Sequence, residues 1–439
     1  MTADRLPARI FHTTMCSLKP ISRLAALCAV LGACTPAHHP VIRIIPMTNL
    51  TPATPASVGM AADLAKRLDS IVAVGMAEGA APGVALAVGR WGRLVHLKAY
   101  GRIDVAPNAP AVTDSTMFDM ASLTKVVATT TAAMILEDEG KLDIDSTVHS
   151  YLPELTDTAK ARITVRMILT HSGGFEAFAP LWREFRGRAQ YLTQINARPL
   201  AYVPGDSTVY SDWDFVLMGL IIERITGMPL DQFVSSRVWQ PLNMHDTGFN
   251  PLASGAMPAD SDCTSAFRAD NPLLARIAMT EIDTVYRHTH IHGIVHDENA
   301  CALGGVAGHA GLFSSARDVA VFSQMLLNGG EYAGVRLIQP TTVARWTARQ
   351  SNKSSRALGW DTPSGNSSAG HYFSPRSFGH TGFTGTSIWV DPERGVFVVL
   401  LTNRVDPTRA NMRAEPLRRD IADAVQSAIL DAPRIEWRR

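Results

Sequence analysis

Residues 119–136 read DMASLTKVVATTTAAMIL, an apolar run in which Lys125 is the only full charge after Asp119. The run has the character of a helix, and the lysine comes one turn after a serine. A buried ammonium must find partners or lose its proton. The position of Lys125 is therefore either a surface feature or part of a functional site.

The spacing of Ser122 and Lys125 favours a site. The two residues are three apart, so on a helix their side chains share a face and can meet. A serine hydroxyl is a poor nucleophile until a base takes its proton, and a lysine in apolar surroundings can have a lowered pKa suited to that role. A cap or surface pair on an ordinary helix is the alternative for this motif alone.

The composition indicates a globular protein with a large core. The chain has 439 residues, of which 46% are hydrophobic, and it contains no long polar tract. Its 41 basic and 40 acidic residues are well mixed and give a net charge of +1. Such a chain has no electrostatic footprint for nucleic acid, so we exclude nucleic-acid partners.

The N-terminus has the pattern of an export signal. Lys19 and Arg23 precede an apolar stretch, residues 24–32, that is too short to cross a bilayer. The stretch ends in LGAC, which resembles the bacterial lipobox, so we expect a signal peptide over residues 1–33 and lipid on Cys34. A signal peptide cleaved nearby without lipid is the alternative, and Met15 fits a signal better as the true start.

The residues after the signal predict a tether and one folded domain. Residues 34–58 are rich in proline and threonine and indicate a tether, followed by a single domain over residues 59–432. Beyond Cys34, only Cys263 and Cys301 remain in the exported chain, either paired or free. We expect an exported protein on the periplasmic side of a bacterial membrane, held there by its lipid.

The order of elements predicts an α+β fold. Residues 60–79 and 415–430 have helical periodicity, while residues 82–101 read as two strands around a tight turn and residues 380–403 return to strands. The middle of the chain is largely helical. We therefore expect one antiparallel sheet built from both termini and flanked by helices, with an inserted, mainly helical lobe.

Two further motifs follow the serine–lysine pair. Tyr210-Ser211-Asp212 stands just ahead of an apolar helix, and His380-Thr381-Gly382 lies on a strand near the C-terminus. The order SxxK, YxN-like, KTG-like resembles the serine β-lactamase and penicillin-binding protein superfamily over residues 61–425. Within it, the chain is similar to class C β-lactamases, D-alanyl-D-alanine carboxypeptidases of HTG type and related esterases. The segments LTHSGGF, VHDENACALGGVAGHAGLFSSARDVAVFSQML and ALGWD support the resemblance.

The resemblance implies roles for the matching residues. Ser122 would be the acylated nucleophile, Lys125 its hydrogen-bonded activator, and Tyr210 the general base or proton shuttle, poised by Lys125 and His380. The backbone N–H groups of Ser122 and Phe383 would form the oxyanion hole. No cofactor or metal is implied.

The remaining matched residues would bind substrate, and two of them depart from the family pattern. His380, Thr381 and Gly382 would line a subsite for a carboxylate, and histidine in place of lysine makes that charge depend on pH near neutrality. Asp212 replaces the usual asparagine and can only accept hydrogen bonds, which puts amide and β-lactam recognition in doubt. Its charge also favours the ammonium of Lys125, which would shift the duty of the base toward Tyr210.

Three other segments invite a different interpretation. Ser172 in THSGG lacks the glycine of a nucleophile elbow, so we expect a structural loop. The alternating His288, His290, His292 and His296 could hold a metal on one strand face, but a loop beside the active site is the favoured interpretation. The glycines of GGVAGHAGLFS lack a Walker lysine and indicate close packing near the serine.

Three classes of function follow. We predict a cell-envelope serine hydrolase that acts through an acyl-enzyme on ester or D-Ala-D-Ala-like peptide bonds, with weak turnover of β-lactams. A class C-like β-lactamase and a catalytically inactive protein that binds penicillin or peptidoglycan are the alternatives. A purely structural envelope protein has no support from the fold alone. The oligomeric state stays open.

Overall fold

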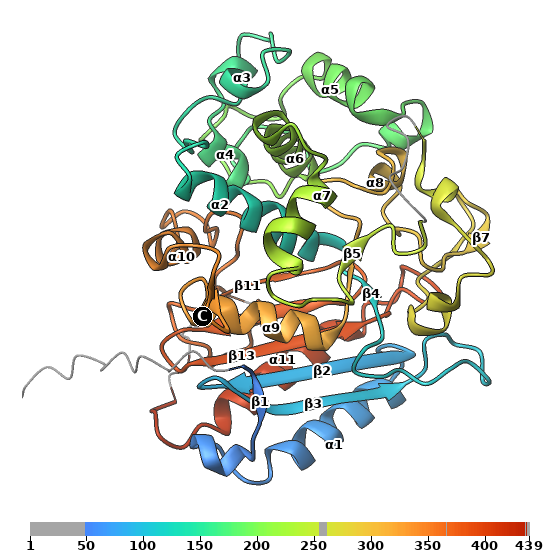
Figure 1. Ribbon diagram of the computed structural model, residues 1–439, viewed down its shortest axis with the longest axis vertical. Coiled ribbons are helices and arrows are strands. Elements are labelled where there is room, and N and C mark those ends of the chain that lie inside the picture. Colours follow the sequence, from blue (N-terminus) through green and yellow to red (C-terminus); the bar gives the residue numbers. More distant parts are fainter. Residues whose placement is uncertain (1–48, 254–260, 366, 435, 437–439) are drawn as a thin grey trace, which may run out of the picture. The chain divides into compact units, whose positions relative to one another are not determined.

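A six-stranded sheet formed by the two ends of the described chain carries the fold (Figure 1). In this computed structural model, which describes residues 49–253, 261–365, 367–434 and 436, every neighbouring pair of strands in the sheet is antiparallel except β1 and β3. The prediction of one sheet built from both termini is confirmed. In sheet order the strands are β1 (Thr51–Pro52), β3 (Arg93–Gly101), β2 (Gly83–Arg90), β13 (Val396–Thr402), β12 (Ser387–Asp391) and β11 (Phe378–Thr381).

Both faces of the central strands are covered. Helices α1 (Leu64–Ala77) and α11 (Ala414–Ser427) lie on one face, and α9 (Ala316–Leu327) lies on the other (Figure 1). Along β2, Val84 and Leu86 belong to the core shared with α1 and α11, whereas Ala85 and Ala87 belong to the core on the opposite face. A strand buried on both faces needs a continuous apolar run, which is what the sequence of β2 provides.

The inserted lobe lies between β3 and β11 in the chain and is mainly helical, as predicted (Figure 1). Its largest element is α6, whose apolar residues are buried through almost its whole length. The helices outside the sheet layer are α2 (Thr131–Asp138), α3 (Val148–Tyr151), α4 (Val165–Leu169), α5 (Gly187–Ala197), α6 (Asp212–Thr226), α7 (Leu230–Val234), α8 (Glu298–Ala302) and α10 (Pro340–Thr347).

Short elements connect the two layers. Three of them form a small sheet in the order β4, β8, β5 that positions the segment ahead of Ser122. These strands and the two hairpins are β4 (Phe118–Asp119), β5 (Gly248–Phe249), β8 (Leu312–Ser314), β6 (Ile282–Asp283) with β7 (Thr289–His290), and β9 (Glu331–Tyr332) with β10 (Val335–Arg336). The 3-10 turns are Pro55–Val58, Ala121–Leu123, Lys160–Arg162, Leu181–Arg183, Cys263–Ala266 and Pro272–Arg276, and π-helices span Lys125–Thr130 and Ser235–Trp239.

The N-terminal boundary differs from the sequence prediction. The expected signal peptide, Cys34 and the first part of the tether lie outside the described residues. Within the expected tether, however, Thr51 pairs with Arg93 of β3, and Val58 is buried. The boundary at residue 59 is therefore late by several residues, because a proline- and threonine-rich composition does not reveal that two residues can complete a sheet edge.

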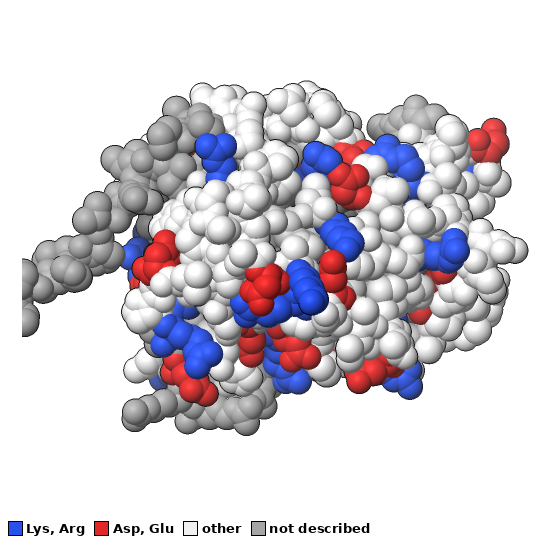
Figure 2. Space-filling view, turned by 90° about the horizontal axis from the view of Figure 1, so that it is seen from below, with Lys and Arg blue, Asp and Glu red and all other residues white. Residues whose placement is uncertain are grey.

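The described surface carries mixed charge. In Figure 2, blue and red side chains alternate across the face seen from below, with no field of a single sign. This mixture agrees with the composition. In the described part of the chain, no helix combines the length and apolar character needed to cross a membrane.

Candidate active site

Ser122 lies in a tight turn that follows β4. Ala121, just before it, has a left-handed φ of 45°, and the Asp119 carboxylate accepts the N–H of Ala121 at 2.8 Å, which stabilises this conformation. The chain then continues as a π-helix before α2 begins, so the predicted regular helix is wrong in its first two turns. The turn leaves Ser122 partly exposed while Lys125 is completely buried.

Lys125 has an acceptor for each of its three N–H groups. Its Nζ donates to Ser122 Oγ at 3.1 Å, to Asp212 Oδ1 at 2.8 Å and to the carbonyl of His309 at 3.1 Å. Burial lowers the pKa of Lys125, but the charge of Asp212 and then that of Tyr210 outweigh burial, and the pKa lies above its ordinary value. The lowered pKa expected from the serine–lysine pair alone is thus wrong, whereas the effect expected of Asp212 is confirmed.

His171 fixes the backbone on both sides of Tyr210. Its carbonyl accepts the N–H of Val209 at 2.9 Å, its Nδ1 accepts the N–H of Ser211 at 3.2 Å, and its ring centroid lies 4.5 Å from that of Tyr210. Nδ1 also lies 3.1 Å from the buried carboxyl of Asp214. Burial is the main cause that lowers the pKa of His171 and raises that of Asp214.

Two cations lie against the ring of Tyr210. Lys125 Nζ is 4.9 Å and the guanidinium carbon of Arg356 is 5.1 Å from the ring centroid. Among the described residues, the Tyr210 hydroxyl has no hydrogen-bond partner. The phenol is therefore held by its ring and its backbone, and its oxygen is left for another group.

His380 is buried on β11, opposite Ile388 of β12. Its Nδ1 lies 2.8 Å from the carbonyl of Thr381. Burial, followed by the charges of Arg356 and Lys125, lowers the pKa of His380 well below its ordinary value. The expectation that the charge of His380 changes with pH near neutrality is therefore wrong, because the sequence did not reveal that this residue is buried near Arg356 and Lys125.

The segment after β11 is tied to the segment before Ser122. Thr384 Oγ1 donates to the Asp119 carbonyl at 2.7 Å, and Thr386 Oγ1 donates to the Met120 carbonyl at 3.1 Å. A Cβ on Gly382 would lie 2.1 Å from Thr386 Oγ1, so the close approach of the two segments requires glycine there. Among the described residues, the backbone N–H groups of Ser122 and Phe383 have no acceptor.

These segments enclose a cavity of about 580 Å³. We call Ser122, Lys125 and Asp212 the floor, with Lys125 buried behind the other two. Apart from Lys125, the predicted catalytic and substrate-binding residues all line the cavity, namely Ser122, Tyr210, Asp212, His380, Thr381, Gly382 and Phe383. Sequence reasoning missed four lining arginines. Arg409 pairs with Glu281 and Glu298, and the other three, Arg356, Arg404 and Arg418, we call the wall arginines.

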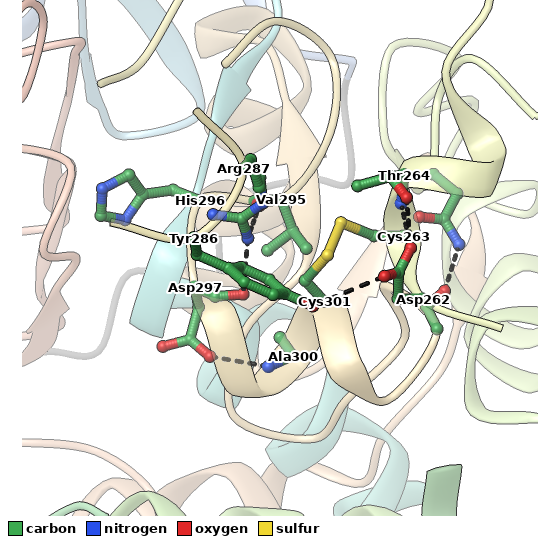
Figure 3. The surroundings of a disulfide bond; sticks show 12 residues. Asp262, Cys263, Thr264, Tyr286, Arg287, Val295, His296, Asp297, Ala300 and Cys301 are labelled. Carbon is green, nitrogen blue, oxygen red and sulfur yellow. Dashed lines mark hydrogen bonds between the residues drawn. A yellow bond between two sulfur atoms is a disulfide. The ribbon is translucent and has the colours of Figure 1, made fainter. Parts of the chain in front are cut away.

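One side of the cavity is formed by α8 and the loop before it. Asp297 caps this helix by accepting the N–H of Ala300 at 2.7 Å, and its carboxylate lies 3.0 Å from His309 Nε2. Cys301 on the same helix forms a disulfide with Cys263, and Tyr286 is drawn beside it (Figure 3). The question of whether the two cysteines pair is thus answered, and the bond ties this side of the cavity to a distant segment.

The four histidines near this loop do not share a strand face. Only Thr289–His290 is a strand, and the side chains diverge: His290 pairs with Asp406, His292 with the carbonyl of Ile277, and His296 with Glu281. The proposed four-histidine metal face is wrong for that reason. His296 lines the cavity, in agreement with the favoured interpretation of a loop beside the site.

Two groups of described side chains bring three ligand-type atoms within 4.8 Å of one another. They are Asp104 with His290 and Asp406, and Asp212 with Asp297 and His309. In the second group, the ammonium of Lys125 already holds Asp212, and a second cation there would be repelled by it.

The other two alternatives from the sequence are structural. Ser172 Oγ lies 3.0 Å from Thr170 Oγ1 in the loop after α4, as expected for a structural loop. In the glycine-rich segment, a Cβ on Gly308 would lie 2.0 Å from the Phe215 carbonyl, so close packing against α6 requires glycine there. Both expectations are confirmed.

Some of the missed residues stood next to segments that the sequence analysis had quoted. Arg356 directly precedes ALGWD, and His171 lies within LTHSGGF. No spacing rule connects either residue to Tyr210, because the contacts depend on how the helical lobe packs on the sheet. No sequence pattern singled out Arg404 or Arg418, because Arg404 only follows a buried strand and Arg418 is one residue of an amphipathic helix.

Comparison with known proteins agrees with this geometry. The sequence pattern of the Beta-lactamase family matches residues 68–423. A protein of Salmonella agona (strain SL483) named "Putative D-alanyl-D-alanine carboxypeptidase" is 34% identical over 391 residues, which cover 84% of this chain and 89% of that protein.

Solved structures share the fold. "EstCE1, a hydrolase with promiscuous acyltransferase activity" has a TM-score of 0.65 at 24% identity, over 83% of this chain and 98% of its own. A penicillin-binding protein homologue from Caulobacter crescentus has a TM-score of 0.63 at 20% identity, over 84% of this chain and 99% of its own.

Proposed function

This chain belongs to the beta-lactamase family and is a serine hydrolase, and we propose that it cleaves D-Ala-D-Ala-like peptides and esters through an acyl-enzyme on Ser122. The observation that carries the proposal is the 3.1 Å hydrogen bond from the buried Lys125 to Ser122 at the floor of the cavity. A nucleophile that is held by a fixed cation and faces a cavity suits acyl transfer.

In acylation, Lys125 holds Ser122 and Tyr210 moves the proton. All three N–H groups of Lys125 are engaged and its pKa is raised, so it stays charged and does not accept the serine proton. Tyr210 as phenolate takes that proton while Ser122 Oγ bonds to the carbonyl carbon of the substrate. The charges of Lys125 and Arg356 at the ring stabilise the phenolate.

The tetrahedral intermediate then collapses. Its oxyanion accepts the free N–H groups of Ser122 and Phe383. The bond to the leaving group breaks, Tyr210 returns its proton to that group, and the acyl ester remains on Ser122. In deacylation a water molecule attacks this ester, its proton passes to Tyr210 and then to Ser122 Oγ, and the acid is released.

A wall arginine supports carboxypeptidase specificity. Arg356 lies beside Tyr210, which protonates the leaving group, and it forms no ion pair with any described residue. A leaving D-alanine carries a carboxylate, which a guanidinium binds by paired hydrogen bonds. In this proposal Arg356 takes the role that the sequence analysis gave to His380.

Position 212 supports esters over β-lactams. Asp212 has no N–H to donate, and its Oδ1 already accepts from Lys125. Esters need less help than amides, because their leaving group departs more easily. We therefore expect efficient ester hydrolysis and weak β-lactam turnover, in contrast to a class C-like β-lactamase. The complete floor argues against an inactive binding protein.

One side-by-side measurement tests these points. We would determine kcat/KM for p-nitrophenyl butyrate, a tripeptide ending in D-Ala-D-Ala, and nitrocefin, with the wild type and Asp212→Asn. The ester and the peptide should be turned over, and Asp212→Asn should raise nitrocefin turnover relative to the ester. A ranking that is unchanged by Asp212→Asn would show that position 212 does not set specificity.

We also propose an envelope location through the lipid on Cys34. The disulfide between Cys263 and Cys301 supports export, since such bonds persist in oxidising compartments. The wild type should partition with membranes, and Cys34→Ser should release the protein or block its maturation. An identical soluble distribution of both forms would contradict the anchor.

A further inference from the structure

Arg404 and Arg418 are buried cations without a carboxylate partner. Their relative exposures are 3% and 9%, and neither forms an ion pair with any described residue. Both donate to backbone carbonyls, Arg404 to those of Arg409 and Asn411 and Arg418 to those of Gly382 and Thr386, but buried charges in proteins are usually also paired with an opposite charge. Two such residues in one cavity therefore require an explanation.

The two arginines influence each other. Burial lowers the pKa of both, and the charge of Arg404 adds to the lowering at Arg418, whose pKa falls to about 10. Glu415, on the exposed first turn of α11, acts in the opposite direction without outweighing burial. An anion placed between the two guanidinium groups would offset the unfavourable free energy of burying each positive charge.

Three of the other carboxylates that line the cavity already have side-chain partners, and the fourth, Asp361, accepts the N–H of Thr362. Asp212 is held by Lys125 at 2.8 Å, Asp297 lies 3.0 Å from His309 Nε2, and Glu298 pairs with Arg409 at 2.7 Å. These groups cannot turn to Arg404 or Arg418 without breaking bonds of their own. No described carboxylate forms an ion pair with Arg404 or Arg418, so an anion that enters with the substrate can take this place.

Arg404 and Arg418 contact the segment of the oxyanion donor Phe383, whereas Arg356 lies at Tyr210. Arg418 Nη2 donates to the carbonyls of Gly382 and Thr386, and the guanidinium carbon of Arg404 lies 4.7 Å from the ring centroid of Phe383. Phe383 supplies an oxyanion donor in the proposed function, whereas Arg356 lies at the tyrosine that serves the leaving group.

We propose that Arg404, supported by Arg418, binds a carboxylate carried by the acyl part of the substrate. The proposal rests on the proposed function, since it assumes that the acyl group is transferred to Ser122. It extends that function by naming the substrate class: acyl groups that bear a negative charge several bonds from the reacting carbonyl. Arg404 binds the anion, and Arg418 holds the Gly382 segment and adds its charge.

A pair of esters that differ in one charge tests the proposal. The substrates are p-nitrophenyl hydrogen adipate and its neutral methyl ester, p-nitrophenyl methyl adipate, and the measured quantity is the ratio of their kcat/KM values. The wild type should favour the anionic ester by about tenfold or more, as expected for a hydrogen bond between charged groups. A wild-type ratio near one or below would overturn the proposal.

Variants separate local binding from general electrostatics. Arg404→Gln should bring the ratio close to one, and Arg404→Lys should retain part of the preference. Arg413→Gln is the matched control, because Arg413 directly precedes α11 but does not line this cavity, and it should keep the wild-type ratio. Equal ratios in Arg404→Gln and the wild type, or an equal loss in Arg413→Gln, would overturn the assignment.

Two further outcomes keep the test decisive. If Arg404→Gln does not fold, the wild-type ratio and the Arg404→Lys ratio decide the matter by the same criteria. If neither ester acylates Ser122, as judged by p-nitrophenol release and the mass of the intact protein, the proposed function fails. That failure differs from hydrolysis of both esters without charge preference, which would overturn only the present inference.

Discussion

At the floor of the cavity every N–H of Lys125 has an acceptor, whereas the wall arginines have no carboxylate partner among the described residues. Both regions contain cations, of which Lys125, Arg404 and Arg418 are buried. The two regions differ in which groups compensate the positive charges. The protein fixes the floor in advance, as chemistry at Ser122 requires, while the wall leaves its cations for groups that arrive with the substrate.

The floor is the region whose loss should cost most. Ser122→Ala removes the nucleophile, and we expect hydrolysis of any substrate to fall by at least about 10³-fold. Covalent labelling by a fluorescent phosphonate, followed by the mass of the intact protein, should disappear with it. An unchanged thermal unfolding midpoint serves as the control, and retained labelling in the variant would refute the assignment of the nucleophile.

The second prediction asks whether the floor and Tyr210 act as one unit. Lys125→Ala and Tyr210→Phe should each lower kcat by about 10²- to 10⁴-fold, because one holds the serine and the other moves its proton. The double variant should lose little more than the worse single variant, since either change already disables proton transfer. Losses that multiply fully would show two independent contributions.

The sequence predicted the floor better than the wall for a physical reason. The meeting of Ser122 and Lys125 depends only on local helical spacing, and it survives even though the segment is a 3-10 turn followed by a π-helix. The strands near both termini could also be predicted, because a strand that is buried on two faces needs a continuous apolar run. Both predictions depend only on residues that are close together in the sequence.

The wall depends on contacts between distant segments. Arg356 and Tyr210 are in contact only because the helical lobe packs on the sheet, and no local sequence pattern predicts that contact. The same holds for the direction of a pKa shift: His380 resembles a titrating histidine in the sequence but is buried beside two cations in the fold. The alternating histidines of residues 288–296 offered a metal face only as the less favoured interpretation, and most of the alternation falls in a loop.

The third prediction concerns the wall alone. Arg356→Gln should raise KM for a peptide ending in D-Ala-D-Ala by about tenfold, the usual cost of losing a hydrogen bond to a charged group. The same peptide with a C-terminal amide is the matched substrate and should respond much less, because it offers no carboxylate. Equal effects on both peptides would assign Arg356 to the chemistry at Tyr210 and remove it from carboxylate binding.

The smallest expected effect decides which residue of the wall carries the charge. The pKa of His380 is lowered, so its cation exists only well below pH 6.5, whereas the arginine stays charged and the raised pKa of Lys125 keeps the floor charged as well. The ratio of kcat/KM for the peptide acid to that for its amide should therefore change by less than about twofold between pH 6 and 8. Taking the ratio cancels any titration that both substrates share. A histidine cation with an ordinary pKa would instead lower the ratio by more than about tenfold over this range. A fall with a midpoint near pH 6.5 would thus return the carboxylate to His380, and it would mean that the wall, unlike the floor, changes its charge with pH.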